Sequence, residues 1–179
     1  MIIRTEQQHE IEKIYSLVKT AFESSKHSDG TEQDYLNFLR KSERYVPEFA
    51  LVAEDSGKLI GQVILTKTYI QTDNGRKEKV LLLGPVAVLL EYRCKGVGAA
   101  LINEAMERAK QAGYKAVFLC GEPAYYGRFG FKPTNEYGIG YTITVSEFVP
   151  DDNIPQQYVL CCELYEGALK GIKGKVSVA

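Results

Sequence analysis

A strand, a glycine loop and a helix follow one another in the middle of the chain, and this order constrains the fold more than any other feature. The apolar run from Val80 to Leu90 has the length of a strand buried on both faces. Two glycines, Gly96 and Gly98, come shortly after it. The apolar positions beyond them recur at helical spacing: Leu101, Ile102, Ala105, Met106 and Ala109. The pattern therefore predicts a strand over 79–89 and a helix over 96–112.

A second strand after this helix decides the type of sheet. Gly113 stands just past the helix, where it can cap the C-terminus, and residues 115–120 form a short apolar run typical of a strand. A strand, a long helix and a strand in immediate succession make a βαβ crossover, so these two strands are predicted to run parallel.

The residues before the crossover predict a meander of antiparallel strands. Strands are expected at 49–54 and 59–69, with turns at 55–58 and 72–75. Together with the crossover, this meander predicts an α+β fold in which a mixed sheet carries helices. The sheet is expected to be neither doubly wound nor wholly antiparallel.

Two helices are expected ahead of the meander. The first spans 6–22, with Thr5 and Gln8 as a capping box, and the second spans 31–41. Their apolar stripes are Ile11, Ile14, Tyr15, Val18, Ala21 and Phe22 on the first, and Tyr35, Phe38 and Leu39 on the second. The elements expected after the crossover are a short helix at 123–129 and strands near 140–145 and 158–165.

Length and composition exclude several classes of protein. The 179 residues suit one domain over 1–179, and 45% hydrophobic content is that of a globular chain rather than a disordered one. A net charge of -1 lacks the basic excess of a nucleic-acid-binding protein. The two histidines and four cysteines, none in C-x-x-C spacing, argue against a metal site. The cysteines are expected to be reduced and mostly buried.

The ends and the hydropathy of the chain predict a cytoplasmic protein. The N-terminus turns polar at once, which argues against a signal peptide. The longest apolar run is far shorter than the ~20 residues that a membrane helix needs. Neither a membrane nor a nucleic acid is therefore expected as a partner.

The loop between the long strand and the helix is suited to binding an anion. Glycines let the backbone approach a phosphate, and the N–H groups of the first helical turn point at it. Arg93 and Lys95 add positive charge. The loop lacks the G-K-[ST] ending of a Walker A motif, and Leu101 stands where a dinucleotide fingerprint has its third glycine. Taken alone, two glycines also fit a tight turn that caps a helix.

Three segments around this loop form a combined pattern. They are the strand end Val86-Ala87-Val88, the loop 93–99 reading Arg-Cys-Lys-Gly-Val-Gly-Ala, and residues 126–131 reading Tyr-Gly-Arg-Phe-Gly-Phe. Their motifs, spacing and order of elements resemble the GNAT superfamily of acetyl-CoA-dependent N-acetyltransferases. The resemblance covers about residues 1–165 and is strongest over 80–133.

The resemblance implies a GNAT-like fold and a place for acetyl-CoA. The fold would have a central mixed, mostly antiparallel sheet of about seven strands with a V-shaped splay, flanked by about four helices. Pantetheine would lie in the splay, near Gly84-Pro85, where proline removes a ladder donor. Backbone contacts to pantetheine and the acetyl carbonyl are implied for Val86, Ala87 and Val88. Contacts to the pyrophosphate are implied for Arg93, Cys94, Lys95, Gly96, Val97, Gly98 and Ala99, with Ala100 adjacent.

Tyr126 is the general acid that the resemblance implies. A phenol of pKa about 10 is a suitable donor to a departing thiolate whose thiol has a pKa of about 8.5. Tyr125 is its rival, one residue away. Both tyrosines could instead only pack the fold, since the chain has 12 of them.

The general base is left open by the sequence. Glu122 follows the end of a strand and could be the base or bind the cation of the acceptor, although the family more often has Asn there. An acidic residue before Pro123 is also a common helix start. Glu54, Glu91 and a chain of waters are the alternatives.

Cys94 and Cys120 fall near the expected site. Cys94 occupies a variable position of the loop motif. An acetyl-Cys route through Cys120 is disfavoured, because no histidine is near it in sequence and direct transfer needs no nucleophile.

The favoured function is transfer of an acetyl group from acetyl-CoA to a primary amine by direct attack in a ternary complex, without a metal. A non-catalytic acyl-CoA-sensing domain and a nucleotide-binding domain of another family are the alternatives. The acceptor is expected to be a small-molecule or peptide amine that contacts residues 24–30, the second helix and the late strands. The protein is expected to be a monomer or a homodimer.

Overall fold

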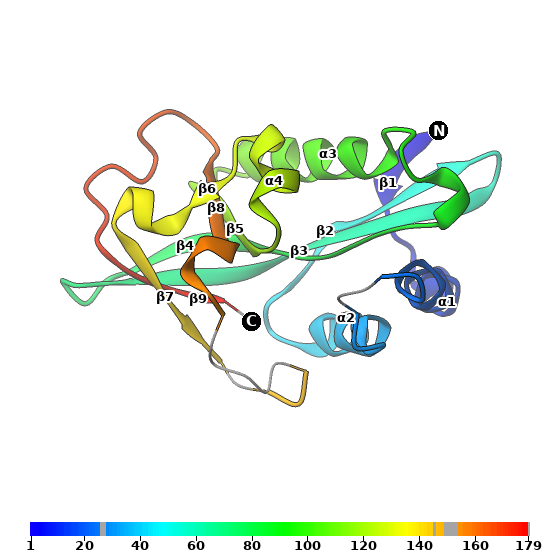
Figure 1. The fold of residues 1–179 in the computed structure, drawn as a ribbon, viewed down its shortest axis with the longest axis horizontal. Helices are drawn as coiled ribbons and strands as arrows, with labels where there is room; N and C mark the ends of the chain where they lie inside the picture. Colours follow the sequence, from blue (N-terminus) through cyan, green and yellow to red (C-terminus); the bar gives the residue numbers. More distant parts are fainter. Residues whose placement is uncertain (26–27, 145, 149–153, 179) are drawn as a thin grey trace. The chain divides into compact units, whose positions relative to one another are not determined.

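The computed structural model describes residues 1–25, 28–144, 146–148 and 154–178. In this part of the chain it has four α-helices and nine strands, which confirms the α+β class (Figure 1). Residues 26 and 27 of the expected acceptor segment and residue 145 of an expected strand lie outside the described residues.

The chain divides into two compact units. The first comprises Met1–Thr66 and Gly84–Glu107, and the second comprises Lys67–Leu83 and Arg108–Ala179. The elements that begin in one unit and end in the other are β3 (Lys58–Thr72), β4 (Lys77–Val88) and α3 (Val97–Gln111). One domain over 1–179 stays a prediction.

The strands of the first unit form the expected meander with one addition. β1 (Ile2–Thr5) pairs antiparallel with β2 (Tyr45–Asp55), and β2 pairs antiparallel with β3. β4 is the next neighbour of β3 in the sheet. Within the first unit, buried residues run continuously over Phe49–Ala53 of β2 and Ile60–Thr66 of β3, because both strands are covered on two faces there.

The start of the first helix differs from the sequence prediction. Residues 2–5 form β1, because they pair with the edge of β2 in register from Ile2–Glu54 to Thr5–Leu51. A 3-10 turn, η1 (Gln8–Glu10), follows, and α1 (Ile11–Phe22) begins after it. The capping box therefore uses Gln7 and Glu10, and the predicted pair of Thr5 and Gln8 was wrong.

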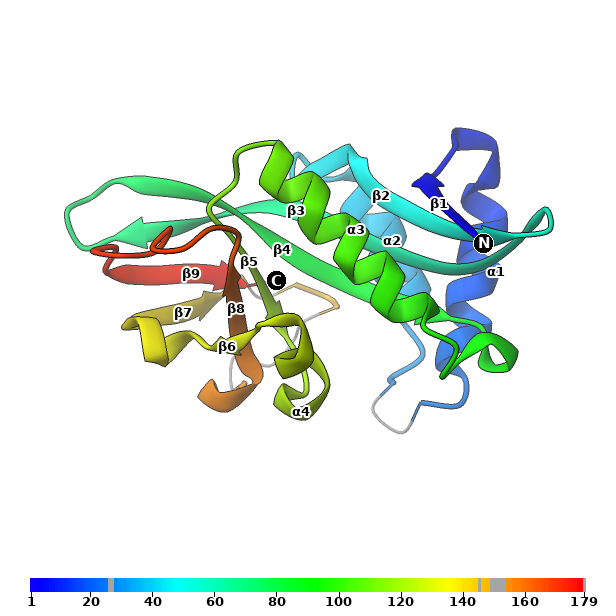
Figure 2. The ribbon, with the colours of Figure 1, turned by 90° about the horizontal axis from the view of Figure 1, so that it is seen from above.

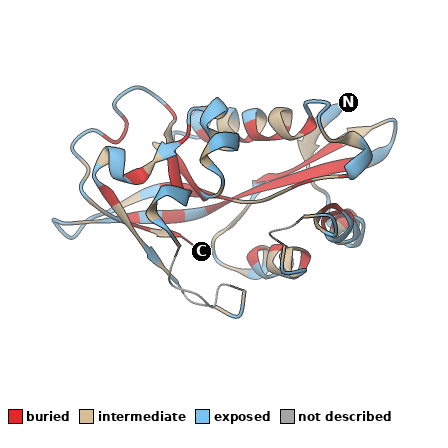
Figure 3. Ribbon diagram, in the orientation of Figure 1, coloured by how far each residue is buried: buried red, intermediate tan, exposed pale blue. Residues whose placement is uncertain are grey.

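Two helices cover one face of the first unit's strands, and α3 covers the opposite face (Figure 1). α1 and α2 (Glu32–Lys41) turn their buried residues toward the sheet (Figure 3). The core on this side contains Ile14, Leu17, Val18, Ala21, Leu36, Leu39, Ala50, Val52, Ile64, Ala87 and Leu89. In α2 the buried pair is Leu36 and Leu39, while Phe38 is 40% exposed, so the predicted stripe was shifted on the helix surface.

The second unit contains the parallel pair that the crossover predicted. β5 (Ala116–Cys120) runs parallel to β4, with Leu81 opposite Val117 and Leu82 opposite Phe118. The register between these strands comprises those two pairs, although β4 continues to Val88 and β5 to Cys120. Short pairing between these two strands is what a splay of the kind expected here requires.

The remaining strands of the second unit form two groups, one next to β5 and one next to β3 (Figure 2). β8 (Val159–Glu163) pairs antiparallel with β5 and with the two-residue β6 (Lys132–Pro133). β9 (Gly174–Val178) pairs antiparallel with β3 and parallel with β7 (Ile139–Ile143). β9 was missed at the sequence level, where only the alternation of Val176 and Val178 marks it; both residues are fully buried.

Candidate active site

The loop before α3 adopts a conformation that leaves backbone donors unpaired within the helix. Cys94 and Gly96 have left-handed backbones, with φ of 59° and 81°. The first bond of the helix runs from the Ala100 N–H to the Gly96 carbonyl, at 2.9 Å. The N–H groups of residues 97–99 precede this bond and have no acceptor within the helix. Alternation of left-handed and other residues is a geometry that forms anion-binding concavities.

The surroundings of this loop favour an anion electrostatically. Cys94, Lys95 and Gly96 are exposed. The first turn of α3 contains no acidic residue. Lys95 holds its ammonium nitrogen 5.6 Å from the ring centre of Tyr92. The positive end of the helix dipole and one lysine therefore act at the same place.

The backbone of β4 alternates between two edges near its end. The Leu89 N–H donates to the Ile60 carbonyl at 3.0 Å, so residue 89 faces β3. The Ala87 carbonyl oxygen also faces β3, because it lies 3.0 Å from the place of a Cβ on Gly61. The N–H and C=O of one residue share an edge, and successive residues alternate. Val86 and Val88 therefore direct their backbone groups to the other edge.

Gly61 on β3 sets the position of the first turn of α3. A Cβ at Gly61 would lie 2.9 Å from Cδ1 of Leu101 and 3.2 Å from Cγ1 of Val97. These contacts are too close for a side chain, so the helix approaches the strand as it does only because residue 61 is glycine. The N-terminal end of α3 is thus held by packing on β3.

Arg93 differs from the other residues of the loop in its contacts. Its Nε donates to the Val88 carbonyl at 3.2 Å, its Nη1 to the Ser24 hydroxyl at 3.1 Å, and its Nη2 to the Ala21 carbonyl. Its backbone N–H donates to the Leu90 carbonyl at 3.2 Å. The arginine is directed at protein acceptors of the first unit.

Tyr126 lies in the second unit on the one-turn helix α4 (Pro123–Tyr126), which follows β5. Its ring lies over Gly121, where a Cβ would come within 2.5 Å of Cε2. The ring also makes an edge contact with Phe131, with centres 5.9 Å apart. Burial, and to a lesser extent the neighbouring Tyr125, raises the pKa of Tyr126 to about 12. The phenol is therefore protonated throughout the neutral range.

Glu122 is the N-cap of the same short helix. Its side chain accepts a long hydrogen bond of 3.4 Å from the Ala124 N–H, and Pro123 takes the first helical position. Glu122 is exposed, as is Tyr125 at 38%. The helix-start role considered for Glu122 is therefore present, and its carboxylate still faces solvent.

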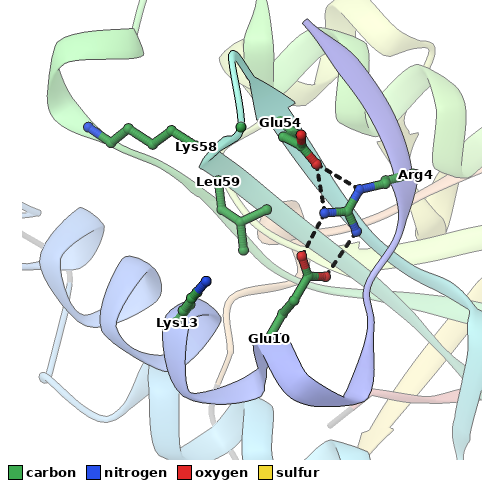
Figure 4. A pocket seen from close by; sticks show the side chains of 7 residues that line it. Arg4, Glu10, Lys13, Glu54, Lys58 and Leu59 are labelled. Atoms are coloured by element: carbon green, nitrogen blue, oxygen red, sulfur yellow. Dashed lines mark hydrogen bonds and ion pairs between the residues drawn. The ribbon is translucent and has the colours of Figure 1, made fainter.

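The two other carboxylates considered as bases are each paired with a cation in the first unit. Arg4 binds Glu54 at 2.7 Å and Glu10 at 2.6 Å (Figure 4). Lys58 binds Glu91 at 2.9 Å and holds the pKa of that carboxyl below its usual range. Glu91 is therefore a weaker base, and the Glu54 carboxylate is occupied by Arg4, so neither residue is favoured.

The pocket around Arg4 is a charged cavity with its own internal pairing. It measures about 380 Å³, and its lining residues are Arg4, Glu10, Lys13, Glu54, Gly57, Lys58 and Leu59 (Figure 4). The guanidinium lies between two carboxylates, whose charges offset it. The cavity therefore has a structural explanation and contains none of the residues expected to bind acetyl-CoA.

The cysteines are all free thiols, and the expectation that most are buried was wrong. Cys94 and Cys120 are exposed, Cys162 is half-buried and Cys161 is buried. Although Cys120 reaches the surface, the protein atoms around its thiol raise the pKa to about 11. A thiol that holds its proton is a poor nucleophile, which argues against the acetyl-Cys route.

The part of the chain that the structure describes has neither a metal-binding cluster nor a membrane-spanning helix. It contains no group of three or more histidine, cysteine or acidic residues placed to hold a metal ion. None of its helices has the length and apolarity needed to cross a membrane.

The described residues contain a mixed sheet, a crossover helix that follows a glycine loop, and a tyrosine on a short helix after the parallel strand. These elements are the ones that the resemblance to GNAT acetyltransferases implied. A family model described as an acetyltransferase (GNAT) domain matches residues 2–134. The chain therefore belongs to the GNAT acetyltransferase family, as its sequence pattern predicted.

Two relatives from Escherichia coli (strain K12) are named as uncharacterized N-acetyltransferases. YhbS is 30% identical over 132 residues, which are 74% of this chain and 74% of YhbS. YjhQ is 35% identical over 104 residues, or 57% of this chain. That match spans 56% of the length of YjhQ.

Solved structures give the same result for the fold. The crystal structure of YhbS from E. coli in complex with CoA has a TM-score of 0.81 and 27% identity, and covers 99% of this chain and 89% of that one. A GNAT acetyltransferase from Brucella melitensis in complex with acetyl-CoA has a TM-score of 0.75 and 25% identity, covering 99% and 95%. The predicted GNAT-like fold is confirmed.

The structure groups the predicted residues by unit. The strand end 86–88 and the loop 93–100 belong to the first unit, whereas Glu122 and Tyr126 belong to the second. Sequence reasoning missed Gly61, although a lone glycine inside a strand pattern is a known sign of close backbone approach. It also missed the partners of Arg93, for which the sequence carries no signal, because Ala21 and Ser24 are about 70 positions away.

Proposed function

We propose that this protein transfers the acetyl group of acetyl-CoA to a primary amine of a small-molecule or peptide acceptor. The observation that carries the proposal is the loop before α3, in a member of the GNAT family. It combines two left-handed residues, exposed backbone and a helix N-terminus without acidic residues. These features suit the pyrophosphate of CoA, and the relative YhbS was solved with CoA.

In this proposal acetyl-CoA, the acetyl donor, is held mainly by backbone groups of the protein. The N–H groups of residues 94–99 contact the pyrophosphate, with Ala100 adjacent and Lys95 supplying charge. Val86 and Val88 pair with the pantetheine arm in the manner of an added strand, because their backbone groups face the edge of β4 away from β3. Ala87 faces β3 and contributes its small side chain to the core.

Catalysis is proposed to occur by direct attack of the amine on the thioester. The amine nitrogen forms a bond to the acetyl carbon, and the bond from that carbon to sulfur breaks. Tyr126 donates its proton to the departing sulfur, and the proton carried by the attacking nitrogen restores the phenol. The products are the N-acetylated acceptor and free CoA, and no covalent enzyme intermediate or metal takes part.

Glu122 is proposed to bind the ammonium group of the acceptor or to accept a proton from it. Glu122 is exposed, follows β5 after Gly121 and lies four residues before Tyr126. It can bind an ammonium group or take its proton, either directly or through water. The acceptor's identity, a monomeric or homodimeric state and a cytoplasmic location stay predictions.

Binding and turnover test the proposal in sequence. Isothermal titration with CoA and acetyl-CoA is expected to give saturable one-site binding. Amines, aminoglycosides, amino acids and peptides are then supplied as acceptors, and release of free thiol is followed. The absence of binding at millimolar CoA would overturn the proposal. Binding without turnover on any acceptor would instead favour a non-catalytic acyl-CoA-sensing domain.

A further inference from the structure

The two cations of the loop have opposite surroundings. Lys95 is exposed, and its ammonium lies beside the ring of Tyr92. Arg93 is half-buried and places three guanidinium nitrogens on three protein acceptors. One residue is therefore placed to meet a ligand, and the other is placed to hold protein segments together.

The three acceptors of Arg93 come from two segments, the end of β4 and the end of α1 with the residues just beyond it. The Val88 carbonyl belongs to the end of β4, where the pantetheine arm is proposed to pair. The Ala21 carbonyl belongs to the last turn of α1, where a cation is favoured by the helix dipole. The Ser24 hydroxyl lies just beyond that turn, at the start of the segment expected to contact the acceptor.

We propose that Arg93 is a positioning residue and not a phosphate ligand. It ties the end of α1 to the donor-binding end of β4, and so fixes the direction of the Val88 backbone and the entry into the left-handed Cys94. This inference rests on the proposed function, because its effect is measured on CoA binding. It departs from the pyrophosphate contact that the sequence pattern implied for Arg93.

The shape of the guanidinium is what this role requires. A planar group with donors in fixed directions can serve three acceptors at once, whereas a lysine ammonium is a single point of charge on a flexible stem. Arg93→Lys keeps the charge and loses the geometry. A phosphate ligand would be largely preserved by that change, and a positioning residue would not.

The test compares CoA affinity across matched variants by isothermal titration, with circular dichroism and thermal melts to establish folding. Arg93→Lys and Arg93→Gln are both expected to weaken CoA binding about tenfold. Lys95→Gln is expected to weaken CoA binding and to reduce its salt dependence, because it removes a charge without disturbing the contacts of Arg93. Ser24→Ala removes one acceptor from an exposed site and is expected to weaken binding about threefold.

Three outcomes overturn the inference. Arg93→Lys binding as tightly as wild type while Arg93→Gln loses affinity would show that charge alone matters. Folded Arg93 variants with lower melting temperatures and unchanged affinity would show a purely structural role. If both Arg93 variants fail to fold, Ser24→Ala decides, and unchanged affinity in that variant removes the inference. Failure of the proposed function is distinct, because wild type would then bind no CoA.

Discussion

The loop before α3 and the short helix α4 carry their chemistry on different atoms. In the loop, the groups suited to a phosphate are backbone N–H groups, and the exposed side chains of Cys94 and Lys95 point away from the core. In α4, the suited group is one side-chain hydroxyl, on a ring packed over Gly121 and against Phe131. The loop depends on backbone conformation, and α4 depends on the identity of one residue.

This difference decides which substitutions each region tolerates. Side chains of the loop can change while the backbone keeps its shape, so the glycines and their packing contacts are its sensitive points. At α4 the backbone has no special conformation, and Gly127 lies in the ordinary helical region with φ of -56°. There, removal of a single oxygen atom is enough to abolish the proposed role. The predictions below test this contrast.

Tyr126→Phe is expected to give the largest effect. The change removes the proton donor and leaves the ring packing in place, so kcat should fall by about 100-fold or more, while the Kd for CoA stays within about twofold. The measurement is thiol release with an acceptor found active for the wild type, together with isothermal titration.

Tyr125→Phe is the matched control for this change. Tyr125 touches Tyr126 edge-on, with ring centres 4.9 Å apart, and it is the rival candidate. It is expected to keep nearly full turnover. Loss of turnover in Tyr125→Phe with Tyr126→Phe still active would exchange the two roles.

Gly96→Ala is expected to weaken CoA binding about tenfold. A Cβ at Gly96 meets nothing within 4 Å, but φ of +81° is costly for alanine, about 1–2 kcal/mol. The loop would relieve this strain by changing the directions of its N–H groups. Affinity is measured by titration and stability by urea unfolding.

Gly75→Ala separates strain from function. Gly75 has φ of +85°, also with nothing within 4 Å, and lies in the turn between β3 and β4. It should lose similar stability and keep its affinity for CoA. Equal loss of affinity in both variants would mean that the loop backbone has no special part in binding.

Gly61→Ala is expected to displace the first turn of α3 and so to disturb the loop that precedes it. Its Cβ would meet Leu101 at 2.9 Å and the Ala87 carbonyl at 3.0 Å, so the first turn of α3 must move. Stability should fall by about 1–3 kcal/mol and CoA affinity by about threefold. Gly127→Ala is the control, since nothing lies within 4 Å of its Cβ, and it should fold and bind CoA normally. Wild-type affinity in Gly61→Ala would show that the position of α3 is not critical.

The sequence predicted most of the fold because its patterns there are local. The crossover, its parallel pair and the helices were readable from periodicity and glycines. β1 and β9 were missed because each is short and forms a strand only by pairing with β2 or β3, which are far away in sequence. The shift from Phe38 to Leu36 in α2 arose because both residues are apolar and only packing decides which is buried.

The candidate site divides in the same way. The loop and the tyrosine were recognisable as motifs, and the structure gives the loop its left-handed residues at 94 and 96. The contacts of Arg93 depend on where its side chain goes, which spacing does not encode. The helix-start role of Glu122 was readable, because Pro123 follows it. Likewise, the separation of Val86 and Val88 from Ala87 required the register with β3.

The smallest expected effect concerns the pH dependence of activity at alkaline pH, which tests the surroundings of Tyr126 in α4. Burial raises the pKa of Tyr126 to about 12, so the phenol should stay protonated and active where a solvated tyrosine, with a pKa near 10, would ionise. The rate constant kcat/KM is therefore expected to change by less than about twofold between pH 9.5 and 11, after subtraction of spontaneous thioester hydrolysis.

The same shift means that the unfolded chain releases this proton first, so the free energy of unfolding falls as the pH rises from about 10 toward 12. Circular dichroism over the same range excludes unfolding as a cause. A fall in kcat/KM centred near pH 10, present in the wild type and absent from the residual activity of Tyr126→Phe, would mean that the catalytic phenol is solvated. The contrast between a half-buried side chain in α4 and an exposed backbone in the loop would then be lost.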